Sequence, residues 1–182
     1  LCSVGILNAH AENVAIAKSS LVGDGIVEFV PQGFDQTKTP SLILKEEPTA
    51  KGSVPSDWEL YPQFTVVDGK ANASLSLTGE ISLYGGGEVT GPLLRNGQYI
   101  KLWNTDTGAY GVDGGKRLYQ SHPWVLGVRR DGSAFGILFD SSWKSELHTN
   151  SDKIEFNTEG ALFRIYIIDR ESPKDVLKGL AE

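Results

Sequence analysis

The feature that most limits the possible folds is a series of short apolar or alternating runs, each separated from the next by turn residues. The runs have the length of β-strands, and their spacing is typical of an antiparallel sandwich or barrel. They lie at residues 26–30, 42–44, 64–67, 73–77, 81–84, 99–103, 124–128, 135–139, 154–156 and 162–168. The sequence therefore predicts an all-β protein built as an antiparallel β-sandwich.

Two Asp-Gly pairs mark the most definite hairpins. Asp68-Gly69 and Asp131-Gly132 each stand between two of the apolar runs. Each pair predicts a two-residue turn, because Asp and Gly accept the positive φ angles that primed turns require. Residues 125–128 and 137–139, which flank the second pair, are almost continuously apolar, and this predicts burial on both faces of the sheet.

Composition excludes several classes of protein. Of 182 residues, 40% are hydrophobic, which excludes disorder of the bulk. A formal net charge of −6 argues against nucleic acid or an anionic membrane as the main partner, and no apolar run approaches the ~18 residues of a membrane span. A single cysteine, Cys2, excludes an internal disulfide. His10, His122 and His148 are scattered, so the sequence indicates neither a metal site nor another cofactor.

Residues 1–11 have the pattern of a signal-peptide tail. The first seven are mostly apolar, and Ala9-His10-Ala11 places small residues where signal peptidase reads them. Because the chain contains no methionine, Leu1 is not expected to be a translational start. We therefore expect an exported protein, periplasmic or extracellular, whose mature chain begins near Glu12. An ordinary first strand or a disordered terminus is the alternative, and the residues leave it open.

The C-terminal residues predict the start of a helix. Ser172 is an expected N-cap, Pro173 suits the first helical position, and Asp175 stands three residues after the cap. Val176, Leu177 and Leu180 follow at helical spacing and form an apolar stripe. The chain stops at residue 182 without a glycine C-cap. We therefore expect more protein to follow.

Gly85-Gly86-Gly87 is interpreted as a close approach of two strands. A phosphate-binding loop would lead into a helix, whereas here Val89-Thr90-Gly91-Pro92 follows and does not open one. Consecutive glycines in a strand instead favour a crossing where no side chain fits. The sequence also lacks the Gly-x-Ser-x-Gly elbow of many serine hydrolases.

Aromatic residues are frequent among polar residues in the glycine-rich middle of the chain. They are Trp103, Tyr110, Tyr119, Trp124 and Trp143. Sugars have apolar faces that stack on aromatic rings and hydroxyl groups that pair with carboxylates and amides, so this mixture suits carbohydrate. Burial of most of these rings in a sandwich core is the alternative, and composition alone favours it.

An ordered series of motifs gives the chain a resemblance to a known family. The series resembles the N-terminal β-sandwich domain of glycoside hydrolase family 31, the α-glucosidase and α-xylosidase family. It covers residues 80–182, whereas residues 12–79 agree only in being β. The motifs are Tyr84-Gly85-Gly86-Gly87-Glu88, Leu102-Trp103-Asn104-Thr105-Asp106, Leu118-Tyr119-Gln120-Ser121-His122-Pro123-Trp124, residues 131–140 and residues 166–177.

The resemblance implies a galactose-mutarotase-like supersandwich at residues 12–171, with residues 172–182 opening a helix toward a catalytic (β/α)8 barrel. Family members are retaining glycosidases, in which one carboxylate attacks the sugar and a second acts as acid and then as base. Both aspartates belong to the barrel, so no catalytic residue is expected in this chain, which alone should be inactive. The implied partners are an α-linked oligosaccharide and the protein's own barrel.

The resemblance also implies a substrate contact. In the family, a loop of the sandwich reaches over the mouth of the active site, and Asp106 matches its sugar-contacting aspartate. An ionised carboxylate there accepts hydrogen bonds from sugar hydroxyls, whereas the alternative role for Asp106 is to cap a turn. Tyr110 and Trp103 are candidate neighbours, although core packing is the default expectation for Trp103. The loop is richer in glycine than the family pattern, so the sugar preference is left open, as is a lyase reaction.

Two other functions remain open at this stage. One is a stand-alone carbohydrate-binding module, although such a module would not need a terminal helix with an unburied stripe. The other is mutarotation, which needs a general acid and a general base facing one sugar oxygen. His122 and His148 are available for that chemistry, but nothing in the sequence shows that they converge.

Overall fold

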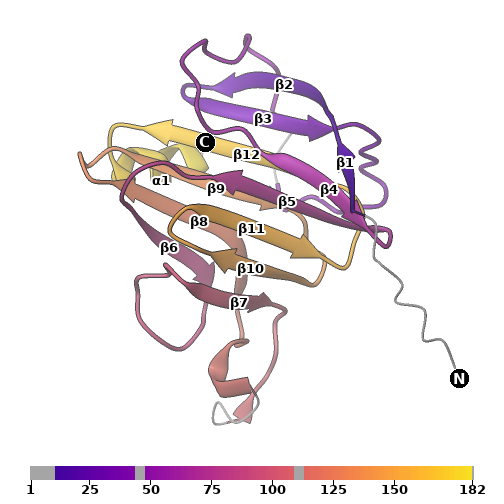
Figure 1. Ribbon diagram of the computed structural model, residues 1–182, viewed down its shortest axis with the longest axis vertical. Coiled ribbons are helices and arrows are strands. Elements are labelled where there is room, and N and C mark those ends of the chain that lie inside the picture. Colours follow the sequence, from indigo (N-terminus) through magenta and orange to yellow (C-terminus); the bar gives the residue numbers. More distant parts are fainter. Residues whose placement is uncertain (1–10, 44–47, 109–112, 182) are drawn as a thin grey trace, which may run out of the picture.

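The computed structural model describes residues 11–43, 48–108 and 113–181. Two six-stranded antiparallel sheets lie face to face, and a short helix near the C-terminus packs on one of them (Figure 1). The predicted all-β sandwich with a short C-terminal helix is confirmed. Residues 1–10, which carry most of the predicted signal peptide, lie outside the described residues. The proposed division at residues 11 and 171 stays a prediction, and Ala11 itself pairs with Val67 in a strand.

Each sheet is assembled from strands that are distant in the sequence. The first sheet has the order β1-β4-β5-β11-β10-β7, with bounds Ala11–Val14, Gln63–Val67, Lys70–Ser76, Lys153–Thr158, Ser145–Thr149 and Gln98–Leu102. The second sheet has the order β2-β3-β12-β9-β8-β6, with bounds Ile16–Gly23, Ile26–Pro31, Arg164–Arg170, Ala134–Asp140, Ser121–Arg129 and Ile81–Gly87. A 3-10 turn, η2 (Asp113–Gly115), lies between β7 and β8.

Consecutive strands join the two sheets at both edges of the sandwich. β1 and β2 are edge strands of opposite sheets, and Ala15 alone connects them. At the other side, β6 and β7 are the remaining edge strands, and they too follow each other in the chain. The chain therefore passes from one sheet to the other at each edge.

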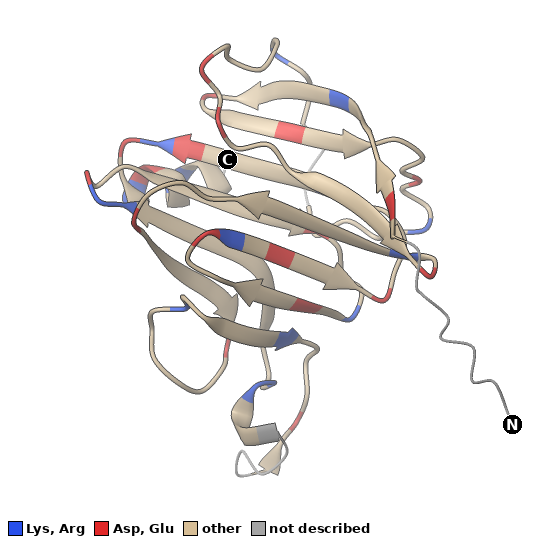
Figure 2. Cartoon of the chain, in the orientation of Figure 1, with Lys and Arg blue, Asp and Glu red and all other residues tan. Residues whose placement is uncertain are grey.

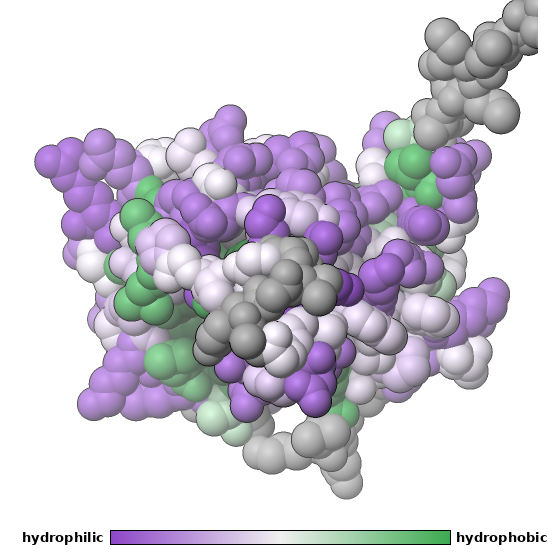
Figure 3. All heavy atoms as spheres, turned by 90° about the horizontal axis from the view of Figure 1, so that it is seen from below, coloured by the Kyte–Doolittle hydropathy of each residue, from purple (hydrophilic) through white to green (hydrophobic). Residues whose placement is uncertain are grey.

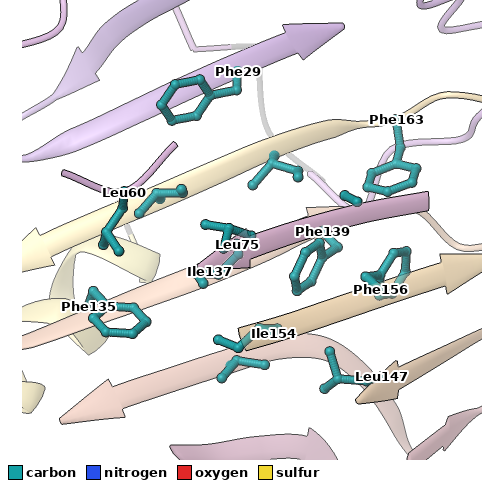
Figure 4. Close-up of a cluster of buried hydrophobic side chains, with 14 of the residues drawn as sticks. Phe29, Leu60, Leu75, Phe135, Ile137, Phe139, Leu147, Ile154, Phe156 and Phe163 are labelled. Carbon is teal, nitrogen blue, oxygen red and sulfur yellow. The ribbon is translucent and has the colours of Figure 1, made fainter. Parts of the chain in front are cut away.

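The core lies between the two sheets and is rich in aromatic rings (Figure 4). Strand residues alternate between this core and the outer faces, as β5 shows with Ala71, Ala73 and Leu75 buried. Phe139 of the second sheet stacks on Phe156 of the first, with ring centroids 4.5 Å apart. Contacts of this kind between layers hold the sandwich together through apolar burial.

The two predicted Asp-Gly turns have different outcomes. Asp68 and Gly69 have φ angles of 51° and 75° and form the two-residue turn between the paired residues Val67 and Lys70, which confirms the first prediction. The second prediction is wrong in its turn length. β8 ends at residue 129, β9 begins at residue 134, and the Gly132 amide donates to the Arg129 carbonyl oxygen at 3.0 Å. In this loop only Gly132 has a positive φ angle, and the Asp131 carboxylate accepts hydrogen bonds from the amide and the hydroxyl of Ser133.

The predicted strand at 42–44 is wrong for its described residues, and three strands were not predicted. Leu42 donates its amide to the Asp140 carboxylate at 2.7 Å, so a side chain takes the hydrogen bond that a strand would make. β1 and β10 were missed because half or more of their residues are polar, and β2 was missed because Lys18-Ser19-Ser20 interrupts its apolar residues. β10, for example, has Leu147 as its one large apolar residue. Their pairing partners, rather than their own pattern, make them strands.

The segment between β3 and β4 packs on the sandwich through aromatic residues. Trp58 lies partly buried against the core and donates its indole N–H to the Leu60 carbonyl oxygen at 2.8 Å. Tyr61 is half exposed, with the edge of its ring against Phe29 at 5.6 Å between centroids.

The glycine triplet confirms the predicted close crossing. A Cβ atom on Gly85 would lie 2.3 Å from the Trp124 carbonyl oxygen, and one on Gly87 would lie 2.4 Å from the Gln120 carbonyl oxygen. Both glycines also have positive φ angles. The backbones of β6 and β8 approach so closely that only glycine fits.

Helix α1 (Pro173–Ala181) begins as predicted. The Asp175 amide donates to Ser172 Oγ at 3.2 Å, and Ser172 Oγ donates to the Asp175 carboxylate at 2.6 Å, which lowers the pKa of Asp175. Val176 is fully buried against the outer face of the second sheet, whereas Leu177 and Leu180 are 51% and 41% exposed. The predicted apolar stripe is thus only partly covered. Within the described ranges, the helices are too short or too polar to cross a membrane.

Candidate functional site

The described residues of the connection from β7 to β8, 103–108 and 113–120, project from the lower end of the sandwich (Figure 1). Several hydrogen bonds fix its base. The Thr105 amide donates to the Leu118 carbonyl oxygen at 2.8 Å, and the Ser121 amide donates to Asn104 Oδ1 at 2.8 Å. Viewed from this end, the surface shows green apolar patches among mainly purple and white residues (Figure 3).

Asp106 lies exposed on this projecting connection. The Tyr119 hydroxyl donates to Asp106 Oδ1 at 3.1 Å, and Tyr119 is itself 53% exposed. The hydrogen bond holds the carboxylate in one orientation and leaves it open to solvent. Its predicted role as a sugar contact stays a prediction, and the predicted neighbour Tyr110 lies outside the described residues.

The expectation that Trp103 packs in the core is wrong. Trp103 is 49% exposed because the alternation that buries Ile100 and Leu102 directs the next side chain away from the core. Trp143 is likewise 45% exposed, in the connection between β9 and β10. Trp124, in contrast, packs beneath α1 on the outer face of the second sheet. The aromatic residues thus separate into a packed group and an exposed group.

Trp103 and Trp143 line one cleft, which we call the aromatic cleft. Its volume is about 360 Å³. The residues that line it are Leu42, Leu102, Trp103, Asn104, Ser121, Pro123, Ser141, Ser142, Trp143 and Ser145. All ten are uncharged, so the aromatic cleft combines apolar rings with hydroxyl and amide groups.

Charged residues lie on the other side of Trp103. A second hollow, of about 320 Å³, is bordered by Trp103 together with Lys101, Arg117, Glu146 and other charged and polar residues. Trp103 therefore stands between an uncharged cleft and a charged one. The two surfaces differ in that the first is lined by uncharged residues alone, whereas the second combines Trp103 with charged side chains.

A buried charge cluster lies beside the aromatic cleft on the outer face of the second sheet. It consists of Glu28, Asp140, Arg164 and Tyr166, and each of the four is at most 5% exposed. Arg164 Nη2 lies 3.2 Å from Asp140 Oδ2, and the Tyr166 hydroxyl donates to Glu28 Oε1 at 2.9 Å. Burial, together with the Glu28 charge, raises the pKa of the Tyr166 hydroxyl above its ordinary value.

The histidines do not form a joint site. His122 lies on β8 and His148 on β10, in different sheets, and His10 lies outside the described residues. The His148 ring packs edge-on against Tyr99, with its Nε2 4.0 Å from Glu146 Oε2. Over residues 11–43, 48–108 and 113–181, no group of three His, Cys, Asp or Glu side chains is placed to hold a metal ion.

Comparison with known protein families assigns the chain to one of them. Residues 20–147 match the family model of the glycosyl hydrolase 31 N-terminal galactose mutarotase-like domain. The chain belongs to this family. The match confirms the resemblance that the motifs between Tyr84 and Asp140 indicated.

Individual relatives agree with this assignment. α-Glucosidase 2 of Bacillus thermoamyloliquefaciens is 34% identical in an alignment 178 residues long that covers 91% of this chain and 22% of that protein. A family 31 α-glucosidase from Bacteroides thetaiotaomicron, known from its crystal structure, is 68% identical over 63% of this chain and 19% of its own, with a TM-score of 0.58. The family 31 dextranase of Flavobacterium johnsoniae, at 19% identity, shares the fold over 94% of this chain and 27% of its own, with a TM-score of 0.68. The chain thus spans only about a fifth of the length of the first relative.

Sequence reasoning found one wall of the aromatic cleft and missed the other. Trp103 was singled out beside Asp106, but Leu42 and the serines around Trp143 were not. These residues are far apart in the chain and meet because β10 pairs with β7. The one signal that the sequence offered at Trp143 was its position directly after Ser141 and Ser142, close to the end of an apolar strand.

Proposed function

We propose that this chain is the non-catalytic N-terminal domain of a longer α-glucosidase-like enzyme, and that its β7–β8 connection forms a wall of the substrate pocket. The observation that carries the proposal is the exposed Asp106 on a projecting connection, oriented by Tyr119, in a chain of the family 31 N-terminal domain. The relatives act as whole proteins several times longer than this chain. A catalytic barrel in the same polypeptide is therefore part of the proposal.

The division of labour follows from the chemistry of retaining glycosidases. Two carboxylates about 5–5.5 Å apart flank the scissile bond in such enzymes, one as nucleophile and one as acid and base. The proposed barrel supplies both. Asp106 accepts hydrogen bonds from sugar hydroxyls, and Tyr119 holds its carboxylate in place. Within the longer enzyme this chain orients the substrate, and by itself it does not hydrolyse.

Kinetics of the longer enzyme test the role of Asp106. The Asp106→Asn variant removes the charge and keeps the size, so it should lower kcat/KM on maltose or isomaltose by about 10- to 100-fold, as loss of a charged hydrogen bond predicts. Tyr119→Phe should give a smaller decrease in the same direction. Asp152→Asn, at an exposed residue between β10 and β11, is the matched control and should leave kcat/KM unchanged. Unchanged kinetics in Asp106→Asn would contradict the proposal.

A stand-alone carbohydrate-binding module is the second candidate, and the uncharged aromatic cleft favours it. The two candidates predict different effects on sugar binding when the rest of the enzyme is removed. A module binds sugar as well without a barrel, whereas a pocket wall contributes Asp106 only when the barrel is present. Mutarotation has no comparable support, since His122 and His148 lie in different sheets.

We further propose that the protein is exported, on the pattern of residues 1–11. Mass spectrometry of the protein recovered from its native host tests this proposal. The expected N-terminus is Glu12 or a residue next to it. A mature protein that retains residues 1–11 would contradict export by this signal.

A further inference from the structure

Trp143 is held in one orientation with part of its indole open. A Cβ atom on Gly160 would lie 2.2 Å from Trp143 Cγ, so the ring packs directly on the glycine backbone. The indole N–H donates to the Lys38 carbonyl oxygen at 3.0 Å. With one side packed and its nitrogen bonded, the ring still has 45% of its surface exposed. A rigid ring of this kind can stack on a ligand without loss of side-chain entropy.

The opposite walls of the aromatic cleft are also fixed. Leu42 is held through its amide by Asp140, whose carboxylate is paired in turn with the buried Arg164. Asn104 accepts from the Ser121 amide, which ties the wall at Trp103 to the start of β8. The cleft is therefore formed before any ligand arrives.

Polar groups in the aromatic cleft suit a ligand that is rich in hydroxyl groups. Four serines and Asn104 line it together with the two tryptophans. Ser145 is 4% exposed, and within the described part of the chain its Oγ has no hydrogen-bond partner. Because Ser145 Oγ has almost no accessible surface, the more exposed Ser121, Ser142 and Asn104 are the polar groups that a ligand would meet.

We propose that the aromatic cleft binds a neutral sugar ring, with an apolar face of the sugar on the open part of Trp143 and its hydroxyl groups toward the serines. The absence of charge among the lining residues argues against an ionic ligand. The volume of about 360 Å³ is at the small end of ligand sites, which suits a mono- or disaccharide rather than a longer chain. Asp106 is not among the lining residues, so this site does not depend on the pocket-wall role. Only the choice of α-linked probes rests on the proposed function.

The four indole N–H signals of the 182-residue chain provide the test, because two belong to the aromatic cleft and two do not. Isomaltose, maltose and cellobiose are titrated into the ¹⁵N-labelled chain to high millimolar concentration. The signals of Trp103 and Trp143 should shift in a saturable way, whereas those of Trp58 and Trp124 should stay in place. The shifts should not depend on salt, because the ligand is neutral.

Variants separate binding from folding. Trp143→Ala should abolish the saturable shift of Trp103 while the rest of the spectrum keeps its dispersion. Gly160→Ala keeps every tryptophan but displaces the ring of Trp143, and it should weaken binding at least about tenfold if stacking geometry matters. Tyr61→Ala removes an equally exposed aromatic residue outside the cleft and should leave the titration unchanged.

Three results would overturn the proposal. The first is no saturable shift with any of the three sugars, and the second is an equal shift of all four indole signals. The third is movement of the Trp103 and Trp143 signals with protein concentration alone, which would identify the cleft as a contact between copies of the chain. Preference for cellobiose over the α-linked sugars would support a sugar cleft and count against the proposed α-glucosidase function. Unchanged kcat/KM in the Asp106→Asn variant would contradict the proposed function but not the binding of sugar in the aromatic cleft.

Discussion

The outer faces of the two sheets differ in what covers them. On the second sheet, α1 covers one part of the outer face, and the segment that follows β3 contributes Phe34 over Arg164 and Leu42 at Asp140. The first sheet carries charged residues on β10 and β11 that face solvent (Figure 2). Its ion pair Lys153–Glu155, at 2.7 Å, joins side chains that are 42% and 35% exposed.

This difference between the two outer faces indicates where charged residues contribute to stability. An exposed pair exchanges one set of hydrogen bonds for another with water and contributes little. The buried charge cluster has no such exchange, so each member depends on the others. Stability should therefore be sensitive to substitution on the covered face and insensitive on the open one, and four substitutions on the covered face test this.

Arg164→Met should have the largest effect. It leaves the buried Asp140 without its cation and Glu28 with Lys18 alone, whose Nζ lies 3.6 Å from Glu28 Oε2, and breaking a buried pair in this way costs about 3–5 kcal/mol. Urea denaturation followed by circular dichroism measures the loss. Lys153→Met, on the open face, is the matched control and should change the unfolding free energy by less than about 1 kcal/mol. Equal effects from the two variants would remove the distinction between the faces.

Tyr166→Phe should have the second-largest effect. The unfolding free energy should fall by about 1.5–3 kcal/mol, because the Glu28 carboxylate loses a buried hydrogen bond. The variant also changes the pH dependence. Burial raises the pKa of the Tyr166 hydroxyl, so above pH ~10 the unfolded chain gives up this proton while the folded chain keeps it. Stability of the parent chain should thus fall as pH rises beyond that point, and less steeply in Tyr166→Phe. Tyr61→Phe, half exposed, is the control, and an identical slope in Tyr166→Phe would refute the assignment.

Val176→Ala tests the contribution of the covering helix. Val176 is fully buried between α1 and the second sheet, and removal of two methyl groups should cost about 1.5–2 kcal/mol. Its neighbour Leu177 is 51% exposed, so Leu177→Ala should change stability by less than about 0.5 kcal/mol. If both variants lose the same amount, the helix packs differently from the arrangement described above.

Ser172→Ala should have the smallest effect of the four, about 1 kcal/mol, because it removes the side-chain cap of α1. The same change should raise the pKa of Asp175, whose carboxylate accepts from the serine hydroxyl. The part of the stability that comes from Asp175 is lost as pH falls through its lowered pKa, so this acid-sensitive part should shrink in the variant. Ser53→Ala, at an exposed position, serves as the comparison in thermal unfolding and NMR titration.

The strands and caps that could be predicted from the sequence are those with a clear local pattern. Strands such as β9 and β12 were predictable because their apolar residues are dense, and the cap at Ser172 was predictable from a short motif. β10 was not, since its polar residues form a strand only through pairing with neighbours, and in β2 the polar run Lys18-Ser19-Ser20 interrupts the apolar residues. Asp106 came from the family resemblance rather than from any physical pattern.

The aromatic cleft shows the same limit at the level of a site. Trp103 and Trp143 are 40 residues apart and Leu42 is farther still, so no spacing rule connects them. The pairing of Ser145 with Leu102 brings the first two together, and the carboxylate of Asp140 brings the third. Sites of this kind become visible only when the register of the strands is known.

The crossings at Ala15 and between β6 and β7 give the sandwich the connectivity of a flattened tube. Neither sheet can separate from the other or slide past it while the chain connects them at both edges. Both layers should therefore exchange their amide hydrogens in one global opening, and the molecule should unfold as a unit.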